Sequence, residues 1–282
     1  TGGMTWLRMC TMSTRRFARR YADSPAQAVI HAAVSRFGSR VVVTTSFGIQ
    51  SAVLLHMVSR IAPATPVVWI DTGYLPPETY RYADRLAREF NLNLHVYQST
   101  VSPARMEALH GRLWEEEDPQ ALDRYHHLRK VEPLDRALRD LRATAWLAGV
   151  RRAQTEHRAG LPRVQRQGRM CKIHPILDWS DDDVERYFRK HDLPRHPLAE
   201  QGYLTVGDAQ LSRPVAPGET DPRASRFGGR KQECGIHTAG FGGVDGAGGA
   251  DGPGDAGGPG TARRGRLPRF SFPAASTRGS HG

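Results

Sequence analysis

The segment with the clearest chemical potential in this sequence is "KQECGIH", residues 231–237, which contains one of only three cysteines in 282 residues. Cys234 has Arg230 and Lys231 a few residues upstream and His237 three residues downstream. Neighbouring positive charges favour the thiolate, which is the nucleophilic form of cysteine. The sequence therefore predicts a reactive thiol at Cys234.

The other two cysteines, Cys10 and Cys171, indicate neither a disulfide framework nor a metal site. An odd, sparse set is unlike the disulfides of secreted proteins, and no CxxC pair typical of metal sites is present. Cys171 lies beside Lys172 in an apolar stretch, which indicates packing, although a resolving pair of Cys171 with Cys234 is left open. The cytoplasm, as a reducing compartment, is the expected location.

A candidate anion site lies in "TTSFGIQS", residues 44–51, between an expected strand and an expected helix. Backbone N–H groups at such a turn, together with the helix dipole, attract negatively charged ligands. Ser46 and Ser51 can donate hydroxyl hydrogen bonds, and Gly48 permits close approach of a ligand to the backbone. Phe47 is assigned to the same substrate-binding turn. The segment lacks the GK[ST] ending of the Walker loop of nucleoside triphosphatases. A plain tight turn without a ligand is the alternative to an anion site.

Two further segments follow expected strands and carry polar side chains. The first, "DTGYLPPETY" at residues 71–80, starts with Asp71 and Thr72. Asp71 can bind a ribose hydroxyl or hold the following turn, and the sequence leaves both open. The second, residues 149–162, carries arginines whose forked guanidinium groups suit phosphate or sulfate oxygens, with a plain surface helix as the alternative. These arginines are Arg151, Arg152 and Arg158.

The segment "YHHLRKVEPLDRAL", residues 125–138, offers a cation close to an expected helix start. Its adjacent histidines, His126 and His127, have no third ligand nearby, so zinc is not expected. Lys130 precedes the helix start at residues 132–133 and is the stronger candidate, as a phosphate contact.

The order of expected elements positions these groups. Short apolar, β-branched runs alternate with helical patterns, which is typical of a mainly parallel, open α/β sheet with helices on both faces. Ligands of such sheets bind at the carboxyl ends of the strands, here after Thr45, Ile70 and Val150. Strands are expected at residues 40–45, 65–71, 94–99 and 143–150, and helices at 25–37 and 76–90.

Composition adds a basic character and a change near the C-terminus. The formal net charge is +11, which fits either a solvated basic surface or a polyanionic ligand. No apolar run approaches the roughly 20 residues that span a membrane. Eleven of the 22 residues at 239–260 are glycine, so residues 239–282 are expected to be a disordered tail. The expected domains are an unplaced extension, 1–23, and a catalytic domain, 24–238.

Seven segments together resemble one family, the assimilatory 3′-phosphoadenylyl-sulfate (PAPS) reductases and the related adenylyl-sulfate (APS) reductases. The resemblance runs in order from about residue 25 to 238, and its ECGIH element is the most specific part. It implies an adenine nucleotide α-hydrolase-like fold. The glycines of "FGGR" at 227–230, Gly235 and the glycine-rich tail predict that residues 227–238 form a mobile segment that carries the thiol. The segments are "SFGIQSAV", "DTGYLPPETY", "KVEPLDRAL", "WLAGVRRAQTEHRA", "HPILDW", "HPLAEQGYLTVGD" and "KQECGIH".

The resemblance also implies a mechanism. Cys234 would attack the sulfur of PAPS, release adenosine 3′,5′-bisphosphate and become S-sulfonated, and a thioredoxin or glutaredoxin thiol would then release sulfite. No bound metal is needed for attack on sulfur. The positions that match substrate-contacting or neighbouring basic positions of the family are Lys130, Arg158, Lys172, Arg223, Arg226 and His237.

Departures from the family pattern bear on the substrate. APS reductases of the bacterial and plant type hold an iron–sulfur cluster on four cysteines, and thiolates are required there. The residues at those places are Tyr125, His126, Asp208 and Leu211, so no cluster is expected and PAPS is the favoured substrate. Gln50 stands where nucleotide-activating relatives of the fold carry Asp, which favours reduction over ATP cleavage.

Alternatives stay open within this interpretation. A cluster-free enzyme that uses APS is one, and a nucleotide-binding redox sensor with Cys234 as its redox group is another. Neither nucleic acid nor a membrane is an expected partner. The sequence leaves the oligomeric state open, a homodimer included.

Overall fold

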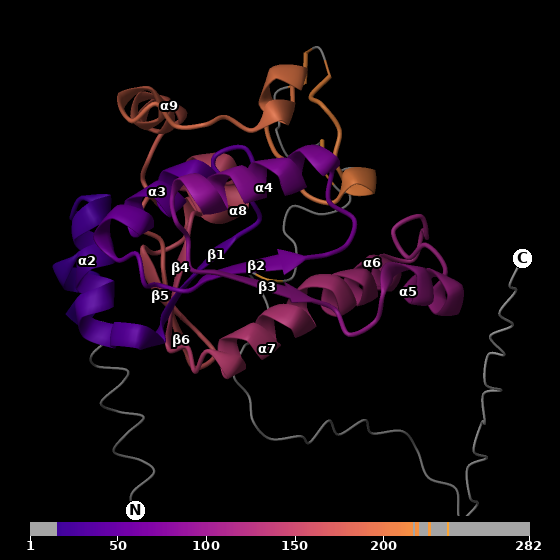
Figure 1. Cartoon of the computed structure of the whole chain (residues 1–282), viewed down its shortest axis with the longest axis horizontal. Helices are drawn as coiled ribbons and strands as arrows, with labels where there is room; N and C mark the ends of the chain where they lie inside the picture. The colour runs from indigo at the N-terminus through magenta and orange to yellow at the C-terminus, as the bar shows by residue number, and fades with distance from the viewer. Residues whose placement is uncertain (1–15, 217, 220–224, 227–235, 237–282) are drawn as a thin grey trace, which may run out of the picture. The chain divides into compact units, whose positions relative to one another are not determined.

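A computed structural model of the chain describes residues 16–216, 218–219, 225, 226 and 236 (Figure 1). Its centre is a six-stranded sheet in the order β3-β2-β1-β4-β6-β5. All neighbouring strands pair in parallel except β5, which is antiparallel to β6 at one edge. The expected mainly parallel α/β sheet is confirmed. The strands are β1 Val41–Thr45, β2 Val67–Asp71, β3 Leu94–Gln98, β4 Ala145–Ala148, β5 Val164–Gln167 and β6 Met170–Ile173.

The apolar strands form because both faces of the sheet are covered. Side chains alternate between the faces, so Val41 and Val43 pack in one apolar cluster and Val42 packs in another. Helices α2, α3 and α4 cover the first face, and α7 covers the second (Figure 1). The helices are α2 Ala26–Phe37, α3 Ser51–Ile61, α4 Pro77–Glu89, α5 Pro103–His110, α6 Pro119–His126, α7 Glu132–Asp140, α8 Glu156–Ala159 and α9 Asp181–Lys190.

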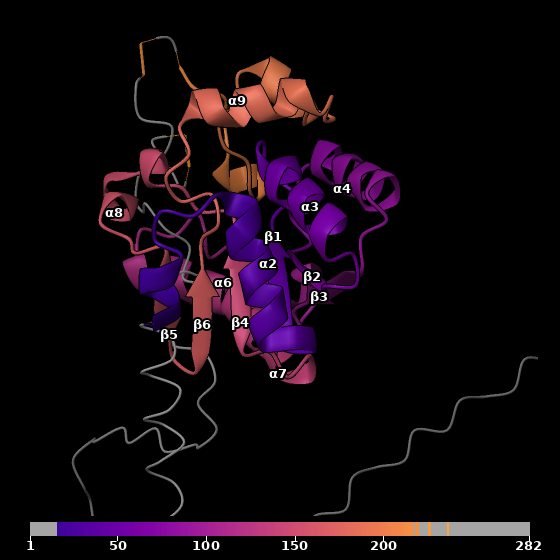
Figure 2. The same ribbon diagram turned by 90° about the vertical axis from the view of Figure 1, so that its left-hand side faces the viewer.

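The chain reverses its direction of winding between β1 and β4. From β1 it proceeds outward through β2 to β3, and it then returns to β4 on the other side of β1. At such a switch point the loops after the two central strands diverge and leave a crevice at the carboxyl edge of the sheet. Figure 2 shows α9 above the sheet, on the side toward which the β6 strand points.

Several elements were not predicted from the sequence, among them the β5–β6 hairpin and the helices α5, α6 and α9. The β5–β6 hairpin is polar at several positions and turns at Gly168, whose φ of 58° lies in the left-handed region. Helix α9 contains three aspartates in its first turn, and Ser180 begins it by accepting a hydrogen bond from the N–H of Asp183 (3.1 Å). That capping pattern was a sequence signal for the helix.

The ends of the predicted domains are described in part. Residues 16–20 are helical, and the Phe17 ring is buried next to that of Phe37, with ring centroids 6.2 Å apart. The predicted tail at 239–282 and nearly all of the predicted mobile segment around Cys234 lie outside the described residues. Within the described part of the chain, no helix has the length and apolar character needed to cross a membrane.

Candidate active site

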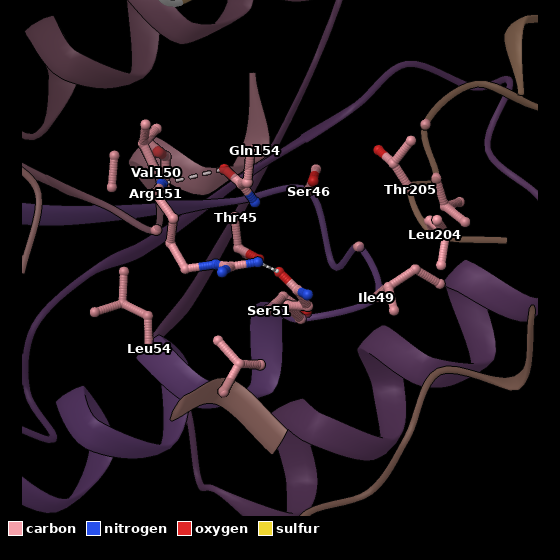
Figure 3. A pocket seen from close by; sticks show the side chains of 18 of the residues that line it. Thr45, Ser46, Ile49, Ser51, Leu54, Val150, Arg151, Gln154, Leu204 and Thr205 are labelled. Carbon is pink, nitrogen blue, oxygen red and sulfur yellow. Dashed lines mark hydrogen bonds between the residues drawn. The ribbon is translucent and has the colours of Figure 1, made fainter. Parts of the chain in front are cut away.

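A cavity of about 690 Å³ opens at the carboxyl ends of β1 and β4. The segments that follow Thr45, Ile70 and Val150 all contribute to its wall, as the sequence predicted. Figure 3 shows Leu204 and Thr205, from a later loop, on the opposite side of the cavity from Val150. The sequence analysis did not identify this later loop as part of the site.

The turn after β1 is held by a buried aromatic residue. Phe47 adopts a φ of 48°, in the left-handed region, and its N–H donates to Thr45 Oγ1 (3.0 Å). Its ring is fully buried and packs edge-on against Trp69, with ring centroids 5.0 Å apart. Phe47 therefore anchors the turn beneath the cavity and does not line it. From the same turn, the wall includes Ser46, Gly48 and Ser51.

Arg151, at the end of β4, joins three elements around the cavity. Its buried guanidinium donates to Gln50 Oε1 (2.6 Å), to Asp181 Oδ1 (2.6 Å) and to the carbonyl of Trp179 (3.0 Å). These bonds link the turn after β1 to the start of α9. Gln50 stands where nucleotide-activating relatives of the fold carry Asp. Its amide oxygen is thus a neutral acceptor for Arg151.

The other two arginines of the predicted loop differ in position. Arg158, on α8, is only 6% exposed and lines the cavity. Its guanidinium donates a hydrogen bond to Gln154 Oε1. Arg152 does not line the cavity, because its guanidinium pairs with Asp178 and with the carbonyl of Leu161. Only Arg151 and Arg158 of the three therefore reach the site.

A buried ion pair forms another part of the wall. Lys130 Nζ lies 2.5 Å from Asp208 Oδ2, and the Thr72 hydroxyl donates to Asp208 Oδ1 (2.5 Å). All three residues line the cavity. Burial by itself raises the pKa of Asp208, but the charge and hydrogen bond of Lys130, the Thr72 hydroxyl and the charge of Arg226 outweigh it and lower that pKa. Asp208 is therefore a buried carboxylate that holds Lys130 at the site.

The four residues at the places of the cluster cysteines lie close to this pair. Tyr125, His126, Asp208 and Leu211 are all buried, and Tyr125 packs in one apolar cluster with Leu211. The Tyr125 hydroxyl accepts from Gln210 Nε2 (3.1 Å). Burial, with the charge of Lys130, lowers the pKa of His126 to about 3, so its imidazole is neutral. The region is packed by protein side chains and contains no thiolate donor at these four places.

Arg226 returns to the cavity from a later part of the chain. Its Nη1 donates to Thr205 Oγ1 (3.3 Å), and its backbone bridges to Ser212. A Cβ atom at residue 207 would lie 2.1 Å from Arg226 Nη2, so Gly207 is needed for this close approach. The sequence analysis identified Arg226 but not Gly207 or Thr205.

Asp71 and Lys172, both assigned to the substrate site from the sequence, do not line the cavity. Asp71 uses its carboxylate within the fold, where it accepts from the Gly73 N–H (2.8 Å), the Tyr80 hydroxyl (2.6 Å) and Gln98 Nε2 (2.6 Å). The sequence left two roles open for Asp71, ribose binding or holding the turn, and these hydrogen bonds are those of a residue that holds the turn.

Lys172, on β6, is almost fully buried. Its Nζ lies 4.3 Å from the centroid of the Trp146 ring and 3.0 Å from Gln167 Oε1. Any effect of Lys172 on substrate is therefore indirect. Its neighbour Cys171 is buried in an apolar cluster, as expected for a packing residue.

Cys234, the predicted nucleophile, lies outside the described residues. The predicted substrate contacts Arg223 and His237 lie outside them as well. One residue of their motif is described. Ile236 lines the cavity, and its carbonyl accepts a hydrogen bond from Gln167 Nε2 (3.2 Å).

Comparisons with known proteins point to a single family. Residues 40–214 match the family model described as "Phosphoadenosine phosphosulfate reductase domain". A phosphoadenosine 5′-phosphosulfate reductase of Synechococcus sp. is 55% identical over 216 residues, which is 77% of this chain and 93% of that protein. One from Thiocapsa roseopersicina is 48% identical, over 78% of this chain and 91% of that protein.

Solved structures agree with these relatives. The crystal structure of phosphoadenylyl-sulfate (PAPS) reductase from Candida auris, in a phosphate complex, is similar with a TM-score of 0.62 and 30% identity. The match covers 70% of this chain and 94% of that chain. An FMN adenylyltransferase from Candida glabrata, at 13% identity and a TM-score of 0.51 over 80% of this chain and 76% of that chain, shares the fold alone.

Proposed function

The chain belongs to the phosphoadenosine phosphosulfate reductase family, and we propose that it reduces PAPS to sulfite and adenosine 3′,5′-bisphosphate through Cys234. It is an oxidoreductase that acts in sulfate reduction. The observation that carries the proposed mechanism is the cavity at the β1–β4 switch point, whose wall combines buried cations with a residue of the ECGIH motif. The buried cations of the wall are Lys130, Arg151, Arg158 and Arg226.

Chain connectivity supports Cys234 as the attacking group. Ile236 lines the cavity, and Cys234 precedes it by two residues. Two residues of extended chain span at most about 7 Å, so the length of chain permits Cys234 to react at this cavity. Arg230 and Lys231 favour its thiolate form.

The proposed first step transfers a sulfonate group. The Cys234 thiolate forms a bond to the sulfur of PAPS, while the bond from that sulfur to the bridging phosphate oxygen breaks. The electron pair of the broken bond leaves with adenosine 3′,5′-bisphosphate, and Cys234 carries the SO₃ group. One thiol of reduced thioredoxin or glutaredoxin then attacks the Cys234 sulfur and expels sulfite. The second thiol resolves the mixed disulfide, so the donor is oxidised by two electrons.

The site residues supply positive charge and hydrogen-bond donors for the anionic substrate. Lys130, Arg158 and Arg226 are proposed to contact the phosphosulfate, because a buried cation binds oxyanions more strongly than an exposed one. The turn after β1 offers backbone N–H groups, with the N-terminus of α3 behind them. Further substrate contacts are proposed for Ser46, Gly48, Ser51, Thr72, Arg223 and His237.

The direct test of this function is a sulfite assay with purified protein, PAPS and reduced thioredoxin, with glutaredoxin and APS in parallel reactions. Sulfite formation that is faster with PAPS than with APS is expected. A faster reaction with APS would show that APS is the substrate. Nucleotide binding without sulfite formation from either compound would support a redox sensor in place of an enzyme.

Removing a cavity cation should weaken substrate binding. Arg158→Ala or Lys130→Ala is expected to weaken the binding free energy of PAPS by about 1.5–3 kcal/mol each, as for the loss of a charged hydrogen bond. Isothermal calorimetry of the folded variants measures this. Arg166→Ala is the matched control, since Arg166 is exposed and does not line the cavity. Unchanged affinity in both cavity variants would remove these residues from the site.

We further propose that the enzyme works without an iron–sulfur cluster, in the cytoplasm. The buried side chains at the four cluster positions support this, because none provides a thiolate. Protein purified under anaerobic conditions is expected to contain no stoichiometric iron or sulfide and to lack visible absorption. Stoichiometric iron and sulfide would refute the proposal.

A further inference from the structure

We propose that Gln167 is a positioning residue that docks Ile236, and with it the motif that carries Cys234, at the wall of the cavity. The inference rests on the proposed role of Cys234. Gln167 ends β5 in the edge hairpin, well before the thiol motif in sequence. Its side chain nevertheless reaches the backbone of residue 236.

The hydrogen bonds of Gln167 have a fixed direction. Lys172 Nζ lies 3.0 Å from one terminal atom of the Gln167 amide, and an ammonium group can only donate. That atom must therefore be the oxygen, which leaves the NH₂ group facing the Ile236 carbonyl at 3.2 Å. A carbonyl only accepts, so the donor and the acceptor match. Lys172 thus selects the amide orientation that docks Ile236.

This pair is held firmly on the sheet. Lys172 is 1% exposed, its ammonium lies over the Trp146 ring, and Gln167 is 9% exposed. The antiparallel pairing of β5 with β6 fixes both backbones. A donor that is already ordered loses little entropy when the Ile236 carbonyl arrives.

The side chain of Ile236 makes a second contact with the body of the protein. It packs against the apolar cluster that covers the α7 face of the sheet, a cluster that includes Val150, Met170 and Leu177. One polar and one apolar contact therefore act on the same residue. Because Cys234 is two residues away, these contacts raise the fraction of molecules in which the thiol is near the cavity.

Gln167 does not line the cavity, so its loss should affect the positioning of the thiol and not the affinity for nucleotide. The informative variant is Gln167→Glu. A carboxylate keeps the size of the side chain and the contact with Lys172, but it cannot donate to the Ile236 carbonyl. If Gln167 only supported Lys172, this variant would behave as the unchanged protein does.

The experiment measures the single-turnover rate of S-sulfonation at Cys234, at saturating PAPS and without a reductant, by quenched flow and mass spectrometry. We expect Gln167→Glu to lower this rate about tenfold, as for one lost hydrogen bond, with an unchanged Kd for adenosine 3′,5′-bisphosphate. Gln165→Ala is the matched control, since Gln165 lies on the same strand and contacts His174 instead (3.5 Å). Its rate should equal that of the unmodified protein.

The outcomes separate the two proposals. If the unmodified protein forms no adduct with PAPS, the proposed function fails. If it forms the adduct and folded Gln167→Glu reacts at the same rate, the positioning role of Gln167 is wrong. A higher Kd for the nucleotide without a slower rate at saturation would also overturn it, because Gln167 would then serve binding. Thermal unfolding confirms that each variant is folded.

Discussion

Replacement of Cys234 by serine is expected to abolish sulfite formation while PAPS still binds with nearly unchanged affinity. A serine hydroxyl is not ionised at neutral pH and cannot form the S-sulfonate, so the rate should fall by several orders of magnitude, as for loss of an enzyme nucleophile. The measurement is sulfite release with PAPS and reduced thioredoxin, alongside calorimetry of PAPS binding.

Cys171→Ala provides the control for this variant. Cys171 is buried in β6 and packs in an apolar cluster, so its replacement should leave turnover in place. More than a trace of turnover by Cys234→Ser would contradict the assignment of the nucleophile. Loss of activity in Cys171→Ala with its fold intact would instead support the resolving pair that the sequence left open.

Replacement of Asp208 by alanine is expected to lower the free energy of unfolding by about 3–5 kcal/mol, because it removes the carboxylate partner of a buried ammonium. Asp208 is fully buried, and Lys130 loses its partner at 2.5 Å. Urea unfolding monitored by circular dichroism measures the change. Asp84→Ala is the control, since the Asp84–Arg88 pair is exposed and such pairs contribute at most about 1 kcal/mol.

Two further measurements identify the cause of that effect. The double variant Lys130→Met, Asp208→Leu should recover much of the lost stability, because the buried ammonium is removed together with its carboxylate, but it should bind PAPS weakly. The pKa of Asp208 is lowered, so its stabilisation is present at neutral pH and is lost as the pH falls through that lowered pKa. Equal stability of Asp208→Ala and the unmodified protein at neutral pH would contradict the buried pair.

The sheet could be predicted from the sequence because its signals are local. The run that forms β2 is buried at every position, and such apolar, β-branched runs between helical patterns are typical of parallel strands. The location of the cavity followed from the same reasoning. Strand β5 was missed because its residues are largely polar and it lies at the edge of the sheet, and β6 was missed because it is only four residues long.

The detailed roles of site residues could not be predicted, because their partners are distant in sequence. Asp208 stood out only as a residue at a cluster position, yet it holds Thr72, which lies 136 residues away. The sequence left two roles open for Asp71, because it does not show that Tyr80 and Gln98 donate hydrogen bonds to the Asp71 carboxylate. Lys172 matched a basic family position, but its ammonium packs on the Trp146 ring and does not line the cavity.

The most direct test of the central claim is the mass of the protein after reaction with PAPS in the absence of any thiol reductant. The proposed mechanism predicts that the intact chain gains the mass of one SO₃ group, that peptide mapping locates it on Cys234, and that reduced thioredoxin removes it as sulfite. An unchanged mass under conditions where PAPS is bound, or an SO₃ group on Cys171 in place of Cys234, would contradict it.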